Sequence, residues 1–106
     1  MNVEHNTQVA ICELLDYYNI TYFKVPNEGK RSVFLGSYFK KEGMKKGVSD
    51  LIILLPMGRC IFIEVKSRTG VQTKEQKEFQ NTVQKLGFEY KIWRTVDDVV
   101  LFLKNK

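Results

Sequence analysis

The chain has 106 residues, of which 43% are hydrophobic and 27% charged, and its net charge at pH 7 is +5. This composition is typical of a folded globular protein, and the length predicts a single domain over residues 1–106. The longest apolar run, residues 51–56, is too short to span a membrane, and the N-terminus lacks the order of a signal peptide. We therefore expect a cytoplasmic protein with no membrane partner.

The first part of the chain predicts one helix and a hairpin. Apolar residues recur at helical spacing over residues 4–18, and Asn19 suits the end of that helix. Residues 20–25, "ITYFKV", alternate as a strand, and residues 32–39, "SVFLGSYF", are rich in strand-forming residue types. With a Pro, Asn and Gly-containing turn between them, these two segments predict a basic hairpin.

The second part predicts a hairpin followed by a helix, a strand and a helix. Residues 49–55 and 60–66 read as strands joined across "PMGR", and residues 89–94 read as a further strand. The pairs Thr73 with Gln76 and Thr95 with Asp98 match capping boxes that begin helices, the first ending near Gly87. The predicted order is αββββαβα, an α/β fold with a mixed central sheet flanked by helices.

Few residues suit a soft metal site. Cys12 and Cys60 are far apart in the sequence and lie in apolar contexts, which predicts two buried free thiols rather than a disulfide or a zinc pair. His5 is the single histidine, so it has no partner for zinc. Any metal must therefore be held by oxygen ligands.

Three ionisable residues interrupt the central predicted strands. Asp50 begins one apolar run, and Glu64 and Lys66 end the next. Because strand side chains alternate between faces, Glu64 and Lys66 share a face. Asp50 joins them if the numbers of paired residues sum to an even value. We expect a connection of residues 57–59 or 56–60, which pairs Asp50 with Lys66 and places Glu64 diagonally.

Two buried carboxylates at this spacing repel each other, and a divalent cation between Asp50 and Glu64 relieves the conflict. Mg²⁺ prefers hard oxygen ligands and commonly takes one or two carboxylates. Lys66 beside them can orient or help to deprotonate an attacking water, or stabilise charge that develops at phosphorus. The three residues predict a centre for phosphodiester hydrolysis. The alternative is a half-exposed salt bridge between Lys66 and either acid.

The positive charge is concentrated just before Asp50. The segment 24–46 carries seven basic residues against Glu28 and Glu42, and it accounts for the whole net charge of +5. A localised positive field of this kind suits a polyanion, most simply nucleic acid. The alternative is a solvated basic surface.

These motifs resemble a known nuclease family. "GVSDL" and "FIEVK" resemble the PD-(D/E)xK signature, and "GMKKGVSDLIIL", "IEVKSRTGVQTKEQKEFQ", "VPNEGKRS" and "EHNTQ" resemble its VRR-NUC branch, the virus-type replication–repair nucleases. The resemblance implies a restriction-endonuclease-like core and a Mg²⁺- or Mn²⁺-dependent endonuclease. Ser49 stands where the branch usually has Pro, which leaves the carboxylate in place and gives the strand entry more freedom.

The resemblance also assigns residues. Asp50, Glu64 and the backbone carbonyl of Val65 resemble the metal ligands, and Lys66 the catalytic lysine. Glu4 resembles the acid of the first helix, where it shares a face with Gln8 and where Glu13 and Asp16 are weaker rivals. A favourable charge near the helix N-terminus also explains Glu4. Gln76 resembles the family glutamine, although the capping box explains it without chemistry.

The resemblance to a nuclease family implies that the basic residues bind DNA. The residues expected to contact phosphates are Lys30, Arg31, Lys40, Lys41, Lys45, Lys46 and Arg68. Single-domain members of the branch resemble homodimeric DNA-repair nucleases that cut branched DNA such as Holliday junctions, in a bacterial or phage-infected cell. Two alternatives stay open: a non-catalytic DNA-binding module on a nuclease-like scaffold, and an interaction domain that binds an acidic protein.

Overall fold

A computed structural model describes residues 2–26 and 33–106 of the chain. The elements run in the order α1 (Val3–Tyr17), β1 (Thr21–Lys24), α2 (Val33–Lys41), β2 (Leu51–Leu55), the 3₁₀ turn η1 (Pro56–Gly58), β3 (Arg59–Val65), α3 (Lys74–Lys85), β4 (Glu89–Trp93) and α4 (Val96–Asn105). Across the described ranges, no helix is long and apolar enough to cross a membrane. The α/β class expected from the sequence is confirmed.

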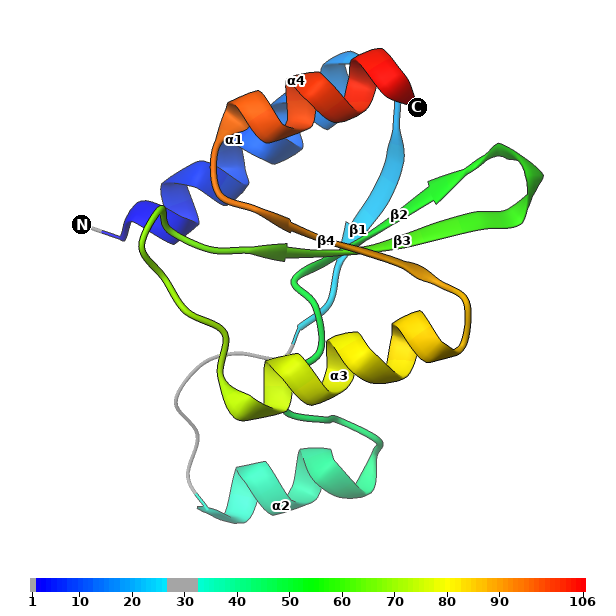
Figure 1. Cartoon of the computed structure of the whole chain (residues 1–106). Coiled ribbons are helices and arrows are strands. Elements are labelled where there is room, and N and C mark those ends of the chain that lie inside the picture. The colour runs from blue at the N-terminus through cyan, green and yellow to red at the C-terminus, as the bar shows by residue number, and fades with distance from the viewer. Residues whose placement is uncertain (1, 27–32) are drawn as a thin grey trace.

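The four strands form one mixed sheet in the order β1-β2-β3-β4. β1 pairs with β2 and β2 with β3 in antiparallel fashion, whereas β3 and β4 are parallel and are connected through α3. Helices α1 and α4 pack together on one face of the sheet, and α3 lies on the opposite face (Figure 1). The sheet is therefore covered on both sides, as a mixed α/β sheet requires.

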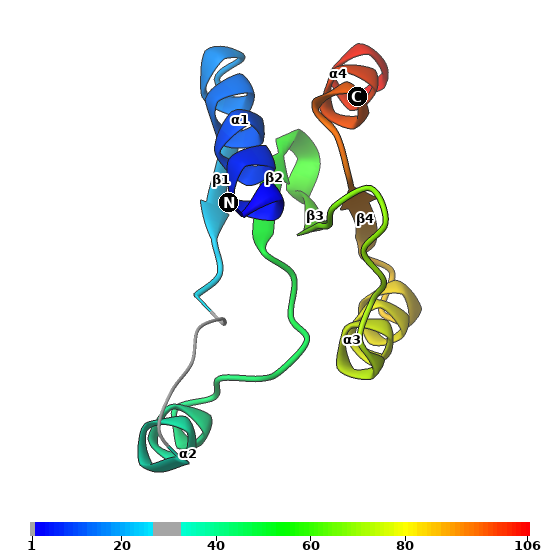
Figure 2. The same cartoon turned by 90° about the vertical axis from the view of Figure 1, so that its left-hand side faces the viewer.

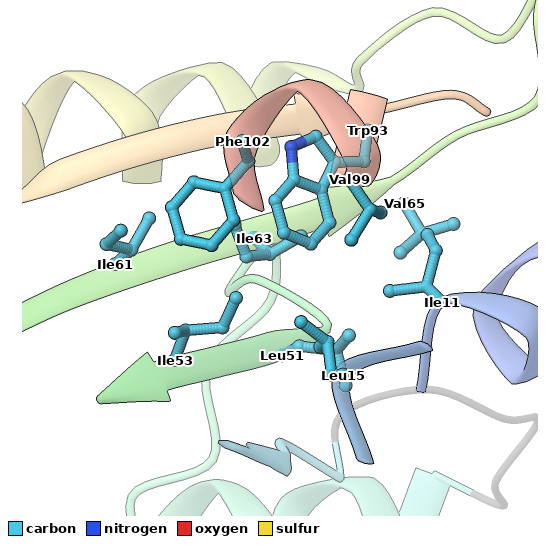
Figure 3. Close-up of a cluster of buried hydrophobic side chains, with 10 residues drawn as sticks. All are labelled: Ile11, Leu15, Leu51, Ile53, Ile61, Ile63, Val65, Trp93, Val99 and Phe102. Atoms are coloured by element: carbon cyan, nitrogen blue, oxygen red, sulfur yellow. The ribbon is translucent and has the colours of Figure 1, made fainter. Parts of the chain in front are cut away.

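The apolar core lies between the sheet and the α1 and α4 helices (Figure 3). Its helical members occur at four- and three-residue spacings, which turn them toward the same face. From these two helices come Ile11, Leu15, Val99 and Phe102. From the strands come Leu51, Ile53, Ile61, Ile63, Val65 and Trp93, which alternate along each strand. Thus one face of β2 and β3 is committed to the core.

The helix ends follow the sequence signals. Thr73 with Gln76 and Thr95 with Asp98 both form capping boxes at the starts of α3 and α4. Asn19, just after α1, has a positive φ of 57°, which asparagine tolerates well at the end of a helix. Cys12 and Cys60 are free thiols as expected, although both are half-buried rather than buried.

The expected strand over residues 32–39 is wrong. Most of this segment forms α2, so the predicted basic hairpin does not exist and β1 pairs with β2 instead. The sequence "SVFLGSYF" is rich in strand-forming types, but four of its five apolar residues, Phe34 with Tyr38 and Leu35 with Phe39, form pairs four positions apart, which is a helical period. Figure 2 shows α2 farther from the sheet than α3, on the same side of it.

The connection from α2 to β2 passes close to the start of α3. Gly47 has a φ of +82°, and a Cβ at this position would lie 2.4 Å from the backbone carbonyl of Glu75. Only glycine fits such a conformation and such a close approach. The contact fixes the connection shortly before Asp50.

The β2–β3 hairpin is shifted relative to the expected one. Its three-residue connection is Pro56–Gly58 rather than 57–59 or 56–60, and Ile52 pairs with Phe62 rather than with Glu64. Met57 and Gly58 both have positive φ values, which produce the tight turn. Paired numbers still sum to an even value, so the expected parity is confirmed, but the ladder ends at the pair of Leu51 with Ile63, and the expected pairing of Asp50 with Lys66 is wrong.

Candidate active site

Asp50 lies directly before β2, at the point where that strand stops pairing with β3. Its N–H donates to the carbonyl of Ile63 at 2.9 Å, and its Oδ2 accepts the N–H of Val65 at 2.7 Å. The Asp50 side chain therefore binds a backbone N–H of β3 just beyond the last residue pair of the two strands, which fixes the carboxylate at the end of the sheet beside β3.

Ser49 itself is only 1% exposed, and its hydroxyl donates to the carbonyl of Leu51 at 3.3 Å. The sequence led us to expect more freedom at this entry to the strand. The buried hydroxyl instead makes a local hydrogen bond across Asp50. This contact helps to hold the backbone on which the Asp50 carboxylate depends.

Glu64 and Lys66 project from β3 toward the side covered by α3. Glu64 is 1% exposed and Lys66 is 9% exposed, and the Lys66 Nζ lies 3.6 Å from Glu64 Oε2. A charge buried this deeply is unfavourable without partners. The structure therefore brings Asp50, Glu64 and Lys66 to the same end of β2 and β3, where the Asp50 carboxylate binds the β3 backbone and Glu64 and Lys66 face α3.

The other oxygen of Glu64 has partners that the sequence analysis missed. Glu64 Oε1 accepts the hydroxyl of Tyr90, on β4, and the Nε2 of Gln72 at 3.3 Å. Gln72 Nε2 also donates to Gln80 Oε1, on α3, at 2.9 Å. In the part of the chain that the structure describes, Glu64 Oε2 is buried without any hydrogen-bond partner. The two oxygens of one carboxylate thus differ sharply.

Tyr90 remains a hydrogen-bond donor in this setting. Burial, followed by the hydrogen bond to Glu64 and the negative charge of that carboxylate, raises the pKa of Tyr90 well above its ordinary value. The charge of Asp50 adds to the same effect on the Tyr90 pKa. The hydroxyl therefore keeps its proton and donates it toward Glu64.

Glu4 reaches the same end of the sheet from α1. Its Oε2 accepts the N–H of Ser67, the residue after Lys66, at 3.4 Å. Glu4, Gln8 and Asp50 also line one cavity of about 590 Å³ between α1 and the strands. Glu13 and Asp16 line that cavity too, but Asp16 accepts the Tyr22 hydroxyl at 2.9 Å.

Gln76 is used by the helix cap. Its Oε1 accepts the Thr73 N–H at 2.8 Å, and its own N–H donates to Thr73 Oγ1 at 3.2 Å. The glutamine that contacts Glu64 is Gln72. The capping explanation for Gln76 therefore matches the geometry, while its predicted part in catalysis stays a prediction.

Comparison with known proteins identifies the family. The profile of the VRR-NUC domain family matches residues 4–97, most of the chain. This chain belongs to the VRR-NUC family. One solved structure, described as a VRR_NUC domain, has a TM-score of 0.73 and 19% identity, covering 99% of this chain and 98% of its own. Another, described as a VRR_NUC domain protein, has a TM-score of 0.73 and 22% identity, covering 98% and 87%.

None of the curated proteins matches the sequence. The VRR-NUC family implies a nuclease-type function, and a nuclease domain implies contact with DNA. The two solved structures support the fold, a mixed sheet flanked by helices that is compatible with the α/β nuclease core expected from the motifs.

The basic residues that we expect to contact DNA lie in two places within the described part of the chain. Lys40 and Lys41 end α2, and Lys45 and Lys46 follow it, all with exposed side chains. Arg68 is exposed in the loop after β3. Lys30 and Arg31 lie outside the described residues.

The loop that carries Arg68 is held by Arg94. The Nη1 of Arg94 donates to the carbonyls of Ser67 and Gly70, each at 2.7 Å. A charged donor bound to two carbonyls is a strong restraint on a short loop. Arg94 therefore fixes the segment that leaves Lys66 and leads toward Gln72.

The donor set fits a hard divalent cation. Within residues 2–26 and 33–106, no group of three or more His, Cys, Asp and Glu is arranged to hold a metal. Mg²⁺ requires fewer, because it commonly binds through one or two carboxylates and completes its shell with other oxygens. Asp50 and Glu64 supply two carboxylates, and the buried Glu64 Oε2, which accepts no hydrogen bond from a described residue, is the atom that a cation would satisfy.

Proposed function

We propose that this VRR-NUC protein is a Mg²⁺- or Mn²⁺-dependent endonuclease that hydrolyses phosphodiester bonds in DNA. The observation that carries the proposal is the state of Glu64 Oε2, which is buried, accepts no hydrogen bond from the described residues, and lies 3.6 Å from the Lys66 ammonium. A buried carboxylate oxygen left in this state is costly unless a ligand completes it. Together with Asp50 on the neighbouring strand, it supports a cation site rather than a purely structural ion pair.

The residues that would hold the cation are Asp50, Glu64 and the carbonyl of Val65, with Glu4 as a further acid. The Val65 N–H points toward Asp50, and in a regular strand the carbonyl of the same residue points to the same side. When bound, the cation supplies a Lewis acid that stabilises negative charge on the phosphate. Oxygen ligands of this kind suit both magnesium and manganese.

Lys66 would act directly on the reacting atoms. Its ammonium is buried beside Glu64, so its position is restrained and water screens its charge poorly. An ammonium held in this way can orient the attacking water and stabilise the charge that develops at phosphorus. Glu64 positions the ammonium while its own oxygen remains directed to the cation site.

The exposed lysines support DNA as the substrate. Lys40, Lys41, Lys45 and Lys46 lie on α2 and on the connection that leads to Asp50, so phosphates bound there would be close to the proposed cleavage site. Contacts of this type hold the backbone and carry no sequence information. A nuclease that binds mainly through phosphates selects the shape of DNA rather than its sequence.

We further propose that the protein acts as a homodimer and prefers branched DNA. β1 is a short edge strand, and Phe23 on it and Tyr38 on α2 are each about half exposed. An open edge with apolar side chains offers a surface that a second copy can cover. A two-fold dimer would present two sites to the opposed strands of a four-way junction.

The test uses the purified full chain with linear, flap, fork and four-way DNA, in Mg²⁺, in Mn²⁺ and in EDTA. We expect products from the wild type with metal and none in EDTA, with the four-way DNA cut fastest. Glu64→Gln should reduce cleavage to background, because it removes one of the two charged ligands. Glu78→Ala, which removes an exposed acid from α3, should cut like the wild type. Light scattering on the same sample gives the mass of the particle.

Two results would contradict the proposal. DNA that is bound equally well by wild type and Glu64→Gln, but never cut with either metal, would indicate a non-catalytic DNA-binding module. Cleavage by Glu64→Gln at the wild-type rate would show that these carboxylates are not the site of the reaction. A monomer that cuts linear and four-way DNA equally would remove the preference for branched substrates.

A further inference from the structure

The two carboxylate oxygens of Glu64 have different partners, which come from three separate parts of the chain. Oε1 accepts the hydroxyl of Tyr90, from β4, and the amide of Gln72, from the loop before α3. Oε2 faces the Lys66 Nζ at 3.6 Å and accepts no hydrogen bond from the described chain. All the donors on this carboxylate are thus gathered on one oxygen, while the other keeps its lone pairs.

The donors are themselves held in place. Gln72 Nε2 donates to Gln80 Oε1 at 2.9 Å and lies 3.3 Å from the Tyr90 hydroxyl, so its amide is oriented by acceptors on α3 and β4. Tyr90 is paired with Phe62 in the parallel register, and its ring makes an edge contact with Phe79. A side chain locked by packing and by hydrogen bonds can position another to within a fraction of an ångström.

We propose that Tyr90 and Gln72 are positioning residues that make Glu64 a one-oxygen ligand. They hold Oε1, so that only Oε2 is presented to the cation. The inference rests on the proposed function, and it adds a residue from β4 and one from the loop before α3 to the site. Mg²⁺ demands a small and regular octahedral shell, in which a carboxylate bound through both oxygens fits poorly.

A purely structural role makes a different prediction. If Tyr90 and Gln72 only satisfy a buried carboxylate, their removal should lower stability and leave the affinity for metal unchanged. If they position Glu64, the affinity for metal should fall even in a folded variant. Partners behind a metal ligand typically change metal affinity by about 10- to 100-fold.

The experiment measures binding of Mn²⁺ to the full chain by the loss of the free-ion EPR signal, without DNA. We expect Tyr90→Phe to weaken Mn²⁺ binding by about tenfold or more, and Gln72→Met to weaken it less, because its contact is longer. Cleavage should need correspondingly more Mn²⁺ for half its maximal rate, while the rate at saturating Mn²⁺ stays within about threefold of the wild type.

The matched control is Tyr22→Phe. It removes the same atom from a tyrosine on β1 whose hydroxyl donates to Asp16 and to the carbonyl of Cys12 instead. We expect it to bind Mn²⁺ like the wild type. Thermal melting of each variant without metal shows that the fold is kept, and if Tyr90→Phe does not fold, Gln72→Met carries the test.

The results separate the two ideas. If the wild type binds Mn²⁺ through Glu64 but Tyr90→Phe and Gln72→Met bind it equally tightly, the positioning role is wrong while the proposed function stands. If the wild type and Glu64→Gln bind Mn²⁺ alike, the proposed cation site is wrong, and the positioning role falls with it. Weaker binding in Tyr90→Phe but not in Tyr22→Phe supports the proposal.

Discussion

The two faces of β3 divide the work of this domain between them. Ile61, Ile63 and Val65 point into the apolar core, where α1 and α4 cover them. Glu64 and Lys66 point to the α3 side, where burial is as deep but depends on hydrogen bonds and charge. Successive residues at this end of β3 therefore alternate between the apolar core and the proposed site.

The comparison shows how so small a domain can bury a carboxylate and an ammonium side by side. Burying apolar side chains on one face provides the free energy that orders the strand, at roughly 25 cal/mol per Å² removed from water. The other face then holds Glu64 and Lys66 at 3.6 Å from each other, with the buried Glu64 Oε2 accepting no hydrogen bond from the described residues. A rigid strand is a better base for such a site than a loop.

The largest effect should come from the α3 side. Lys66→Met keeps the length of the side chain and removes its charge, so we expect single-turnover cleavage at saturating Mn²⁺ to fall on the order of 100- to 1000-fold. The thermal midpoint without metal should fall, because the buried Glu64 Oε2 loses the charge that lies beside it. Cleavage is therefore compared well below that midpoint. Lys77→Met, at an exposed position on α3, is the control. Cleavage within threefold of the wild type would return Lys66 to the role of a salt-bridge partner.

The opposite face should give the reverse result. Ile63 is fully buried in the core, so Ile63→Val should lower the free energy of unfolding by about 0.5–1.5 kcal/mol. Well below its melting temperature the variant should cut DNA like the wild type. Urea unfolding measures the first quantity, and Ile52→Val, at a half-buried position, should cost less. A large loss of cleavage in folded Ile63→Val would show that the two faces are not separable.

The alternation of strand residues made the acidic and basic centre predictable. Asp50 precedes the first strand of one short antiparallel hairpin and Glu64 and Lys66 lie at the end of its second strand, so the hairpin brings them to one end of the sheet. The exact pairing of β2 with β3 was harder to predict, because it depends on whether the turn begins at residue 56 or 57. Met57 adopts a positive φ in this turn, which is unusual for methionine and could not be predicted from its residue type.

Longer-range contacts could not be derived in the same way. Tyr90 reaches Glu64 only through the parallel register of β3 and β4, and Gln72 only through the path of the loop that Arg94 holds. Neither has a local sequence signal. The prediction for the α2 segment was wrong for another reason. Its residue types favour a strand, while the four-residue period of its apolar residues favours a helix. The period was the better guide.

The smallest effect concerns Gln76, which the family resemblance assigns to chemistry and the geometry to the helix cap. Gln76→Ala removes the acceptor of the Thr73 N–H and should cost roughly 0.5–1 kcal/mol of stability. Gln76→Glu keeps a capping acceptor, so it should restore that stability, and we expect it to cut DNA at the wild-type rate. Urea unfolding and cleavage at saturating Mn²⁺ are compared for both. A stable Gln76→Glu variant that cuts slowly would show that the amide group takes part in the reaction, because the cap would then be intact while the chemistry was not.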